Sequence, residues 1–292
     1  MMTIVVKNLS KRYGATQAVD DVSLTIAPNK IHGLLGRNGA GKTTLLNLIT
    51  RKIFPDSGEI SIAGQNVMAN DMILSQVFHV TEKNYYPADY RLKKLLRWCK
   101  EFYPQTDLPY AESLAKQFAL NLEKTPGGLS TGYASIFKAI MALASGAPAL
   151  IFDEPVLGLD AGHRELLYKE LIACYSRSPK TIIISTHLIE EVAGILEEAM
   201  IIDEGRIVLQ RPVEDLLEQS YTVSGEAEKV EAYLAGRPCS GAETMGRHKS
   251  AIVLERLAPT AEQDGKELGL EFGRVSLQKL FISLTNSQGV RR

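Results

Sequence analysis

Residues 36–44 read Gly36-Arg37-Asn38-Gly39-Ala40-Gly41-Lys42-Thr43-Thr44, which matches the G-x-x-x-x-G-K-[ST] pattern of a phosphate-binding loop. The glycines allow backbone N–H groups to point inward around a polyphosphate, in conformations where a Cβ would clash. Lys42 offers an ammonium to the terminal phosphates, and the Thr43 hydroxyl is a ligand for Mg²⁺. An apolar stretch at 31–35 precedes the loop, and apolar residues at helical spacing follow it. The sequence therefore predicts a strand–loop–helix unit with phosphates at the helix N-terminus.

The bulk composition narrows the class of protein. The chain has 292 residues, enough for one large domain and a smaller one. Its 33 basic and 34 acidic side chains give a net charge of −1, so we expect no nucleic acid partner. Three cysteines, Cys99, Cys174 and Cys239, lack metal-ligand spacing, which indicates free thiols in a reducing compartment.

The N-terminal residues and the longest apolar stretch indicate where in the cell the protein is expected. The first residues run directly into a strand-like stretch, so we expect no secretory leader. The longest weakly polar stretch, 139–152, is too short and too interrupted to span a membrane. We therefore expect a cytoplasmic protein that reaches a membrane only through a partner.

Short apolar strands alternate with helices over much of the chain, which predicts the α/β class. Strands are expected at 3–7, 22–26, 31–35, 59–63, 77–81, 149–152, 181–185 and 206–209, and helices at 164–175 and 189–196. Strand signals largely vanish between about 84 and 146, where apolar residues recur at helical spacing, so we expect an inserted helical subdomain. Buried strands separated by helices form a largely parallel sheet with its ligand site at their carboxyl ends.

Residues 212–292 predict a separate accessory α+β domain. From Tyr221 the expected order is strand, helix (226–234), strand, strand (251–255), helix (260–268), strand (270–275) and helix (277–284), which suits a split βαβ sandwich. The last helix has one apolar face formed by Leu277, Leu280, Phe281 and Leu284. That face either packs on its own sheet or braces a dimer.

Three polar side chains follow two of the buried strands. Asp153 ends an apolar strand, and a carboxylate fixed in that way can hold Mg²⁺ through water. Glu154 beside it can polarise an attacking water. A lone histidine after a strand is more often structural, but His187 ends the next strand and would lie within reach of a γ-phosphate.

Residues 129–133 read Leu-Ser-Thr-Gly-Tyr before an apolar helix. Ser130 alone would be an ordinary helix N-cap. Between the phosphate loop and Asp153, however, the stretch resembles the LSGGQ signature of ABC transporter nucleotide-binding subunits, with departures at Thr131 and Tyr133. The resemblance covers about residues 3–215.

Further positions carry the same resemblance. Gly158-Leu159-Asp160 is similar to the D-loop of the family, and His187 to its switch histidine. Tyr13 stands where the family stacks an aromatic ring on adenine, although a tyrosine in a loop is more often involved in packing. Glu82 stands where the family usually has a glutamine that touches Mg²⁺ and faces the membrane partner.

The resemblance implies a fold and a set of site residues. The fold is a P-loop NTPase ABC cassette at 1–211, with a RecA-like parallel sheet core, an antiparallel β piece and the helical subdomain. It implies catalytic roles for Glu154, His187 and Lys42, and Mg²⁺ ligands at Thr43, Asp153 and Glu82. It implies ATP contacts from Tyr13, Gly36, Asn38, Gly39, Ala40, Gly41, Lys42, Thr43, Thr44, Ser130, Thr131, Gly132 and Asp160.

The departures narrow the resemblance to a subgroup. Thr131, Glu82 and the C-terminal appendage resemble ABC-2-type bacterial exporters, above all ATPases of Gram-positive efflux systems for peptides or antibiotics. This implies an ATPase on the inner face of the cell membrane that drives a transmembrane permease subunit. Its partner in the head-to-tail dimer is a second copy or another ATPase subunit. Tyr85, Tyr86 and Tyr90 either dock the permease or pack within their loop.

Other classes of nucleotide hydrolase fit less well. A chromosome-maintenance ATPase needs a long coiled coil before the signature, and a translation-associated factor needs two cassettes. A small-molecule kinase lacks the set of Ser130, Asp160 and His187. A soluble ABC-type ATPase that is not coupled to transport is the alternative that remains open.

Overall fold

The computed structural model describes residues 2–285, which belong to two compact units. The first contains residues up to His187 together with Ile202–Ile207, and the second contains Leu188–Ile201 and residues from Val208 onward. The segment 188–201 groups with the C-terminal residues, and the change of domain at 211 stays a prediction. Within residues 2–285, no helix combines the length and apolar character that crossing a membrane requires.

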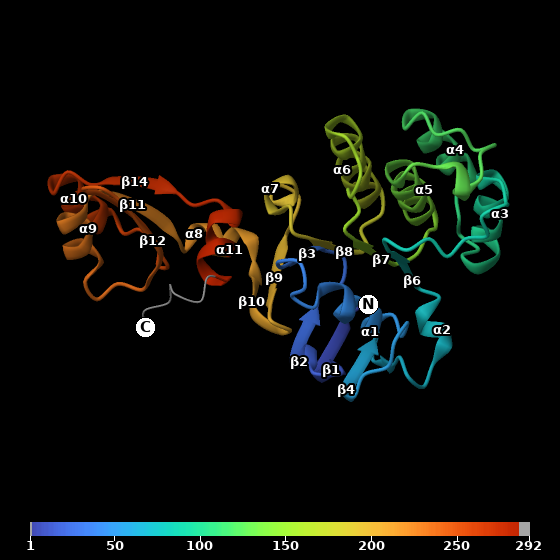
Figure 1. Ribbon diagram of the computed structural model, residues 1–292, viewed down its shortest axis with the longest axis horizontal. Coiled ribbons are helices and arrows are strands. Elements are labelled where there is room, and N and C mark those ends of the chain that lie inside the picture. The colour runs from blue at the N-terminus through green and yellow to red at the C-terminus, as the bar shows by residue number, and fades with distance from the viewer. Residues whose placement is uncertain (1, 286–292) are drawn as a thin grey trace. The chain divides into compact units, whose positions relative to one another are not determined.

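An antiparallel sheet begins the first unit (Figure 1). It has the strand order β2-β1-β4-β5, with β1 at Ile4–Tyr13, β2 at Thr16–Ile26, β4 at Ser57–Ile62 and β5 at Gln65–Asn66. The strands predicted at 3–7 and 22–26 were too short, since the β1–β2 hairpin continues to the pair Tyr13↔Thr16. The outer half of this hairpin is mostly exposed. Its polar residues therefore lack the hydrophobic run from which the inner strands were recognised.

The central sheet has six strands in the order β10-β9-β3-β8-β7-β6. Its strands are β3 (Ile31–Leu35), β6 (Val77–Val80), β7 (Ala149–Asp153), β8 (Thr181–Thr186), β9 (Glu198–Asp203) and β10 (Arg206–Pro212). The pairs β3–β8, β8–β7 and β7–β6 are parallel, which confirms the predicted parallel core. Helix α6 (Ala161–Arg177) connects β7 to β8, and helix α1 (Lys42–Ile49) follows β3 and leads to β4 of the antiparallel sheet.

One part of this region was predicted incorrectly. The helix expected at 189–196 is the short α7 (Ile189–Val192), and strand β9 was not predicted. One residue, Ala193, separates Gly194 from the end of α7. A glycine in a helix costs about 1 kcal/mol of stability relative to alanine. The apolar residues after it therefore belong to a strand.

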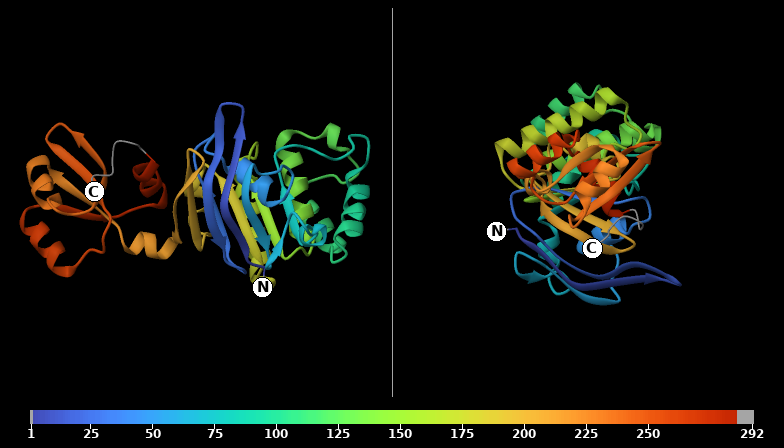
Figure 2. Two further views of the ribbon diagram at one scale, coloured as in Figure 1. Left: turned by 90° about the horizontal axis from the view of Figure 1, so that it is seen from below. Right: turned by 90° about the vertical axis from the view of Figure 1, so that its left-hand side faces the viewer.

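The helical subdomain lies within the first unit. Its helices are α3 (Leu92–Phe102), α4 (Leu108–Gln117) and α5 (Thr131–Ala144), with a 3₁₀ turn, η1, at Pro126–Gly128. Figure 2 shows these green helices gathered beside the strands. Helix α5 is buried along almost its whole length. The short helix α2 (Asp71–Leu74), capped by the Asn70 side chain, was not predicted.

The C-terminal unit contains the predicted split βαβ sandwich. After α8 (Val213–Glu218), which was not predicted, come β11 (Tyr221–Glu226), α9 (Ala227–Leu234), β12 (Cys239–Met245), β13 (His248–Val253), α10 (Pro259–Glu267), β14 (Glu271–Arg274) and α11 (Leu277–Thr285). The sheet order is β12-β13-β11-β14, with antiparallel pairs throughout.

Helix α11 packs within its own unit, on β12, α7 and α8. Leu277, Leu280 and Phe281 are buried there, and the Ser240 hydroxyl donates a hydrogen bond to the Ser283 carbonyl at 2.8 Å. Of the two roles considered for the apolar face of this helix, internal packing accounts for these three residues. Leu284 is half-buried.

The first prediction tests the close approach of β4 to β1. Gly58 has φ +94°, and a Cβ there would lie 2.4 Å from the Asn8 carbonyl oxygen. Gly58→Ala should lower the free energy of unfolding by about 3 kcal/mol, because strain and overpacking add. Urea denaturation followed by circular dichroism measures this loss.

Gly64 supplies a matched control. It also has a positive φ, +77°, but an added Cβ would meet open space. Gly64→Ala should therefore cost only about 1 kcal/mol of backbone strain. Equal losses in the two variants would contradict the packing argument.

Candidate functional site

The phosphate loop joins β3 to α1 and allows almost no added bulk at its two end glycines. A Cβ on Gly36 would lie 2.6 Å from the Ile202 carbonyl oxygen, and one on Gly41 would lie 2.4 Å from that of Ala18. Lys42, the first residue of α1, is 6% exposed. Its Nζ donates hydrogen bonds to the carbonyls of Gly36 at 2.8 Å and Arg37 at 3.1 Å. The ammonium is thus held on the concave side of its own loop.

Asp153 lies at the carboxyl end of β7 and is buried. The Ser185 hydroxyl on the neighbouring strand β8 donates to its Oδ1 at 2.9 Å. Burial raises the pKa of the Asp153 carboxyl, and hydrogen bonds with Thr43 and Ser185 oppose that rise. The carboxylate therefore lies against the hydroxyl that follows Lys42 in the phosphate loop.

Glu154 is the meeting point of the predicted catalytic residues. Its Oε1 lies 3.4 Å from Lys42 Nζ, and its Oε2 lies 3.0 Å from His187 Nδ1. Its backbone has φ +48° and its N–H donates to the Ser185 carbonyl at 2.9 Å. A non-glycine residue in this conformation costs of order 1 kcal/mol and is concentrated at functional sites.

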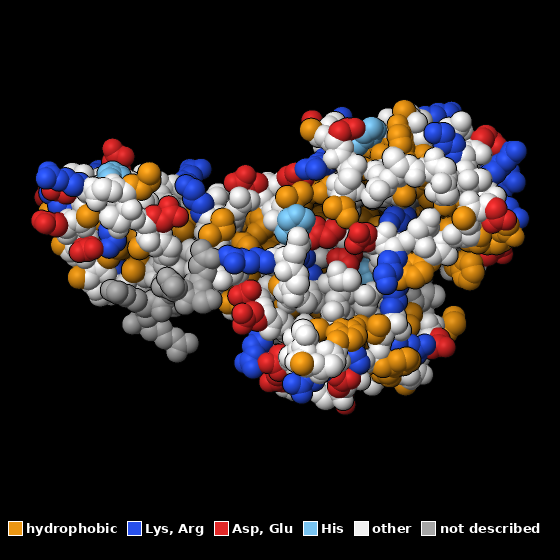
Figure 3. All heavy atoms as spheres, in the orientation of Figure 1, with side chains coloured by type: hydrophobic (Ala, Val, Ile, Leu, Met, Phe, Trp, Pro, Cys, Tyr) orange, Lys and Arg blue, Asp and Glu red, His pale blue; other side chains and the backbone are white. Residues whose placement is uncertain are grey.

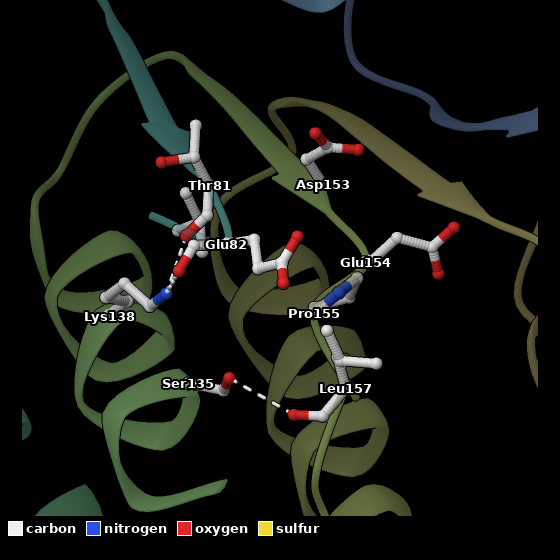
Figure 4. A pocket seen from close by; sticks show the side chains of 9 residues that line it. Thr81, Glu82, Ser135, Lys138, Asp153, Glu154, Pro155 and Leu157 are labelled. Carbon is white, nitrogen blue, oxygen red and sulfur yellow. Dashed lines mark hydrogen bonds between the residues drawn. The ribbon is translucent and has the colours of Figure 1, made fainter. Parts of the chain in front are cut away.

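Glu82 extends toward the same end of β7 (Figure 4). It lines a pocket together with Thr81, Ser135, Lys138, Asp153 and Glu154. The buried Lys138 donates from its Nζ to the carbonyls of Thr81 at 2.6 Å and Glu82 at 2.8 Å. Burial lowers the pKa of the Lys138 amine, and the nearby Glu82 charge opposes this.

The predicted signature and D-loop residues form a second cluster. Ser130 caps α5 and accepts a hydrogen bond from the Tyr133 N–H at 3.3 Å. A Cβ on Gly132 would lie 2.5 Å from the Gly158 carbonyl oxygen, so the two stretches are in close contact. Asp160 caps α6 and accepts from the backbone and ring of His163, and these hydrogen bonds lower the pKa of its carboxyl. Thr131 is the exposed first residue of α5.

The predicted aromatic residues lie in different environments. Tyr13 ends β1 with half of its surface exposed, and Lys11 Nζ lies 5.7 Å from its ring centroid. Tyr86 packs edge-on against Phe137, with 5.9 Å between ring centroids.

Tyr85 and Tyr90 differ in how far they pack within the protein. Tyr90 packs on Trp98 at 4.8 Å between ring centroids, whereas Tyr85 is 67% exposed. Internal packing therefore explains Tyr86 and Tyr90, whereas Tyr85 is exposed with Lys52 Nζ 5.6 Å from its ring centroid.

The donor atoms at the loop fit a magnesium ion. Thr43, Asp153 and Glu82 offer hard oxygen ligands, the type that Mg²⁺ prefers. Among residues 2–285 there is no cluster of three or more His, Cys, Asp or Glu side chains suited to a metal.

Two residues of the site were missed by sequence reasoning. Ser185 was counted only as the end of a strand, although it contacts both carboxylate residues. Lys138 gave a usable signal, because it is the only charged residue in the apolar helix 131–144.

The surface charge agrees with the near-neutral composition of the chain. On the face shown in Figure 3, basic and acidic side chains are interspersed, as 33 basic and 34 acidic residues would suggest.

A lysine of the predicted phosphate loop and two carboxylates thus meet at the carboxyl edge of a parallel sheet. Comparisons with known proteins identify the family of the chain. Residues 19–157 match the model of the ABC transporter family. The ABC transporter ATP-binding protein YtrB of Bacillus subtilis is 29% identical over 216 residues, with 74% of each chain covered. The Nod factor export ATP-binding protein I of Burkholderia lata is 31% identical over 219 residues, covering 73% of this chain and 71% of the relative.

A solved structure described as the ATP binding subunit of an ABC transporter gives the same answer. It superposes with a TM-score of 0.67 at 25% identity, covering 74% of this chain and 92% of the other. This chain belongs to the ABC transporter ATP-binding protein family. It is an ATP-binding subunit with the ABC ATPase fold, as the sequence resemblance predicted.

The second prediction concerns His79, on strand β6 of the central sheet. The Thr50 hydroxyl donates to the Leu46 carbonyl, so His79 Nδ1–H donates to Thr50 at 3.0 Å and the buried Nε2 finds no partner among the described residues. Burial, aided by the charge of Lys52, lowers the pKa of His79 to about 3. The unfolded chain therefore takes up this proton first, and stability falls as the pH drops below about 6.5.

His79→Asn should remove this part of the acid sensitivity. Between pH 7 and pH 5 the variant should lose about 2 kcal/mol less stability than the wild type, at roughly 1.4 kcal/mol per pH unit below 6.5. Urea denaturation at both pH values measures the difference. His248→Asn, at an exposed position, should keep the wild-type dependence, and parallel losses in all three proteins would contradict the assignment.

Proposed function

We propose that this chain hydrolyses ATP as the energising subunit of an ABC exporter, in which closure of an ATP-bound dimer drives a separate transmembrane permease. The observation that supports it is the convergence of Lys42 and His187 on the Glu154 carboxylate. This places an acceptor for a proton beside the lysine that would bind the terminal phosphates.

The phosphate loop is the proposed binding site for the triphosphate. Its inward N–H groups and the N-terminus of α1 would hold the phosphate oxygens, with contributions from Gly36, Asn38, Gly39, Ala40, Gly41, Thr43 and Thr44. Lys42 would exchange its loop carbonyls for phosphate oxygens. Tyr13 would stack on adenine from the end of β1, where half of its surface is free.

Thr43, Asp153 and Glu82 are the proposed residues for Mg²⁺. When bound, the ion would neutralise charge on the phosphates. The Thr43 hydroxyl already lies against the Asp153 carboxylate, and Ser185 fixes the rotamer of that carboxylate. Glu82 reaches the same region from the end of β6.

Glu154 is the proposed general base. A carboxylate accepts a proton from an attacking water when it lies within hydrogen-bond reach, directly or through one water. Its left-handed backbone, tied to Ser185, aims the side chain away from Asp153 and toward Lys42 and His187. His187 would hold the carboxylate and contact the γ-phosphate.

A second subunit would complete each site. Ser130, Thr131 and Gly132 stand at the N-terminus of the 14-residue helix α5, whose backbone N–H groups and dipole favour an anion. Asp160 lies next to this cluster. In a head-to-tail dimer these residues would meet the γ-phosphate bound by the other copy. The dimer would sit on the cytoplasmic face of the membrane, with the exposed Tyr85 among its permease contacts.

The third prediction tests the base. Glu154→Gln keeps the size of the side chain and one acceptor oxygen but removes the negative charge and the ability to take up a proton. ATP turnover should fall by about 100-fold or more, the range for loss of a general base, while ATP affinity stays within a few-fold. Steady-state phosphate release and equilibrium nucleotide binding measure the two quantities.

Glu165→Gln supplies the control for this substitution. Glu165 is an exposed residue of α6, so its amide variant should turn over ATP like the wild type. Wild-type turnover in Glu154→Gln would overturn the assignment of the base.

The fourth prediction tests the dimer. Glu154→Gln with ATP should sediment as a dimer, because the bound nucleotide bridges two copies and is not hydrolysed. Adding Ser130→Arg should return it to a monomer that still binds ATP, since the arginine blocks the contact across the interface. Analytical ultracentrifugation distinguishes these states. A Glu154→Gln protein that stays monomeric with saturating ATP would favour a heterodimer with another ATPase subunit.

A further inference from the structure

The helix that begins with the signature is attached to the segment that carries Glu82. Lys138, in the middle of α5, donates from its Nζ to the carbonyls of Thr81 and Glu82 at 2.6 and 2.8 Å. Figure 4 shows the two hydrogen bonds reaching the backbone at the end of β6. The ammonium therefore binds the main chain of this segment and leaves the Glu82 carboxylate free to extend toward Asp153 and Glu154.

A second contact joins the same two elements. Phe137, the neighbour of Lys138 on α5, packs edge-on against the ring of Tyr86. Segment 81–86 is thus held to α5 at its start by hydrogen bonds and at its end by an aromatic pair. Between these contacts lie the exposed Glu82, Lys83 and Tyr85.

The position of Lys138 is costly for a purely structural role. Nearly every other residue of α5 from Ile136 onward is apolar and buried, and an apolar side chain there would avoid desolvating a charge. Thr81 is buried and its carbonyl uses one of the lysine donors, but Glu82 is exposed, so water could satisfy the Glu82 carbonyl without any lysine. The buried ammonium is therefore best explained by what it fixes in place.

We infer that Lys138 is a positioning residue that fastens the Thr81–Glu82 backbone to α5 and thereby sets where the Glu82 carboxylate lies relative to Asp153 and Glu154. The inference rests on the proposed function, because it takes Asp153 and Glu154 as the hydrolytic carboxylates and α5 as the helix that meets the nucleotide of the other subunit. Movement of α5 on dimer closure would then move Glu82 directly, without relay through other side chains.

The test begins with Lys138→Met, which keeps an unbranched stem and removes the charge and its donors. ATP turnover should fall about tenfold, the lower end of the range for loss of an outer-shell partner, with the KM for ATP within about threefold. Hydrogen exchange at the amides of 82–84 should accelerate, because the segment loses its attachment. Lys138→Gln, which keeps one donor, should give an intermediate turnover and serves if the methionine variant does not fold.

A double-mutant cycle with Glu82→Ala separates positioning from general damage. If Lys138 acts through Glu82, Lys138→Met should lower turnover by less than about twofold in the Glu82→Ala background, because coupled residues are not additive. Independent multiplication of the two effects would overturn the inference. So would wild-type turnover in Lys138→Met.

Thr106→Val is the matched control for loss of a buried polar contact in the helical subdomain. Thr106 is buried, and its hydroxyl donates to the Tyr103 carbonyl at 2.6 Å. This variant should lower the melting temperature and leave turnover per folded molecule unchanged. An equal loss of turnover in Thr106→Val and Lys138→Met would make Lys138 merely structural and overturn the inference. ATP turnover of the wild type and of Glu154→Gln is measured in the same assay. If these two turn over ATP equally, the proposed function fails, whatever the result for Lys138→Met.

Discussion

The parallel pairing of β7 with β8 is the constraint on which the site depends. It sets Asp153 opposite Ser185, and this one serine then holds both carboxylate residues. Its hydroxyl donates to the Asp153 side chain, and its carbonyl accepts the N–H of Glu154. Because successive residues of a strand face opposite sides of the sheet, a slip of one residue would turn these groups to the wrong face. The buried Thr181 at the start of β8, whose hydroxyl donates to the Met2 carbonyl, would lose its partner in the same slip.

The same pairing explains the geometry of Glu154. The strand ends at Asp153, and the next residue takes a left-handed conformation that would be unfavourable without support. The hydrogen bond to Ser185 in β8 and the contacts with Lys42 in α1 and with His187, just after β8, supply that support. The Glu154 carboxylate therefore points away from that of Asp153. Asp153 contacts Ser185, whereas the Glu154 side chain contacts Lys42 and His187. Two neighbouring carboxylates can therefore have different contacts, because the backbone turns at Glu154.

Sequence reasoning predicted the parts of the site that depend on local pattern. The strand at 31–35 and the helix after the phosphate loop need only their own residues, and the ends of parallel strands meet by topology. Convergence of Lys42, Asp153, Glu154 and His187 was therefore predictable, and the structure brings these side chains together. The outer β1–β2 hairpin and α8 lack a distinctive local pattern, so their boundaries depend on tertiary packing. Strand β9 has an apolar run, but no strand was assigned there after a helix that was predicted too long. Lys138 lies 57 and 56 positions after its partners Thr81 and Glu82. A contact over that separation cannot be predicted from local pattern in a single sequence.

Charge balance connects the unusual residues of the site. Glu82 adds a third carboxylate near Asp153 and Glu154, and like charges in a partly buried site repel each other. Lys42 offsets one of these carboxylates by direct contact with Glu154. Lys138 places a second ammonium at the backbone of Glu82, where the two charges favour one another. An acidic residue at position 82 is therefore better tolerated with a buried lysine at 138 than with an apolar one. The cation that binds the backbone of this segment thus also offsets part of the negative charge that the segment carries.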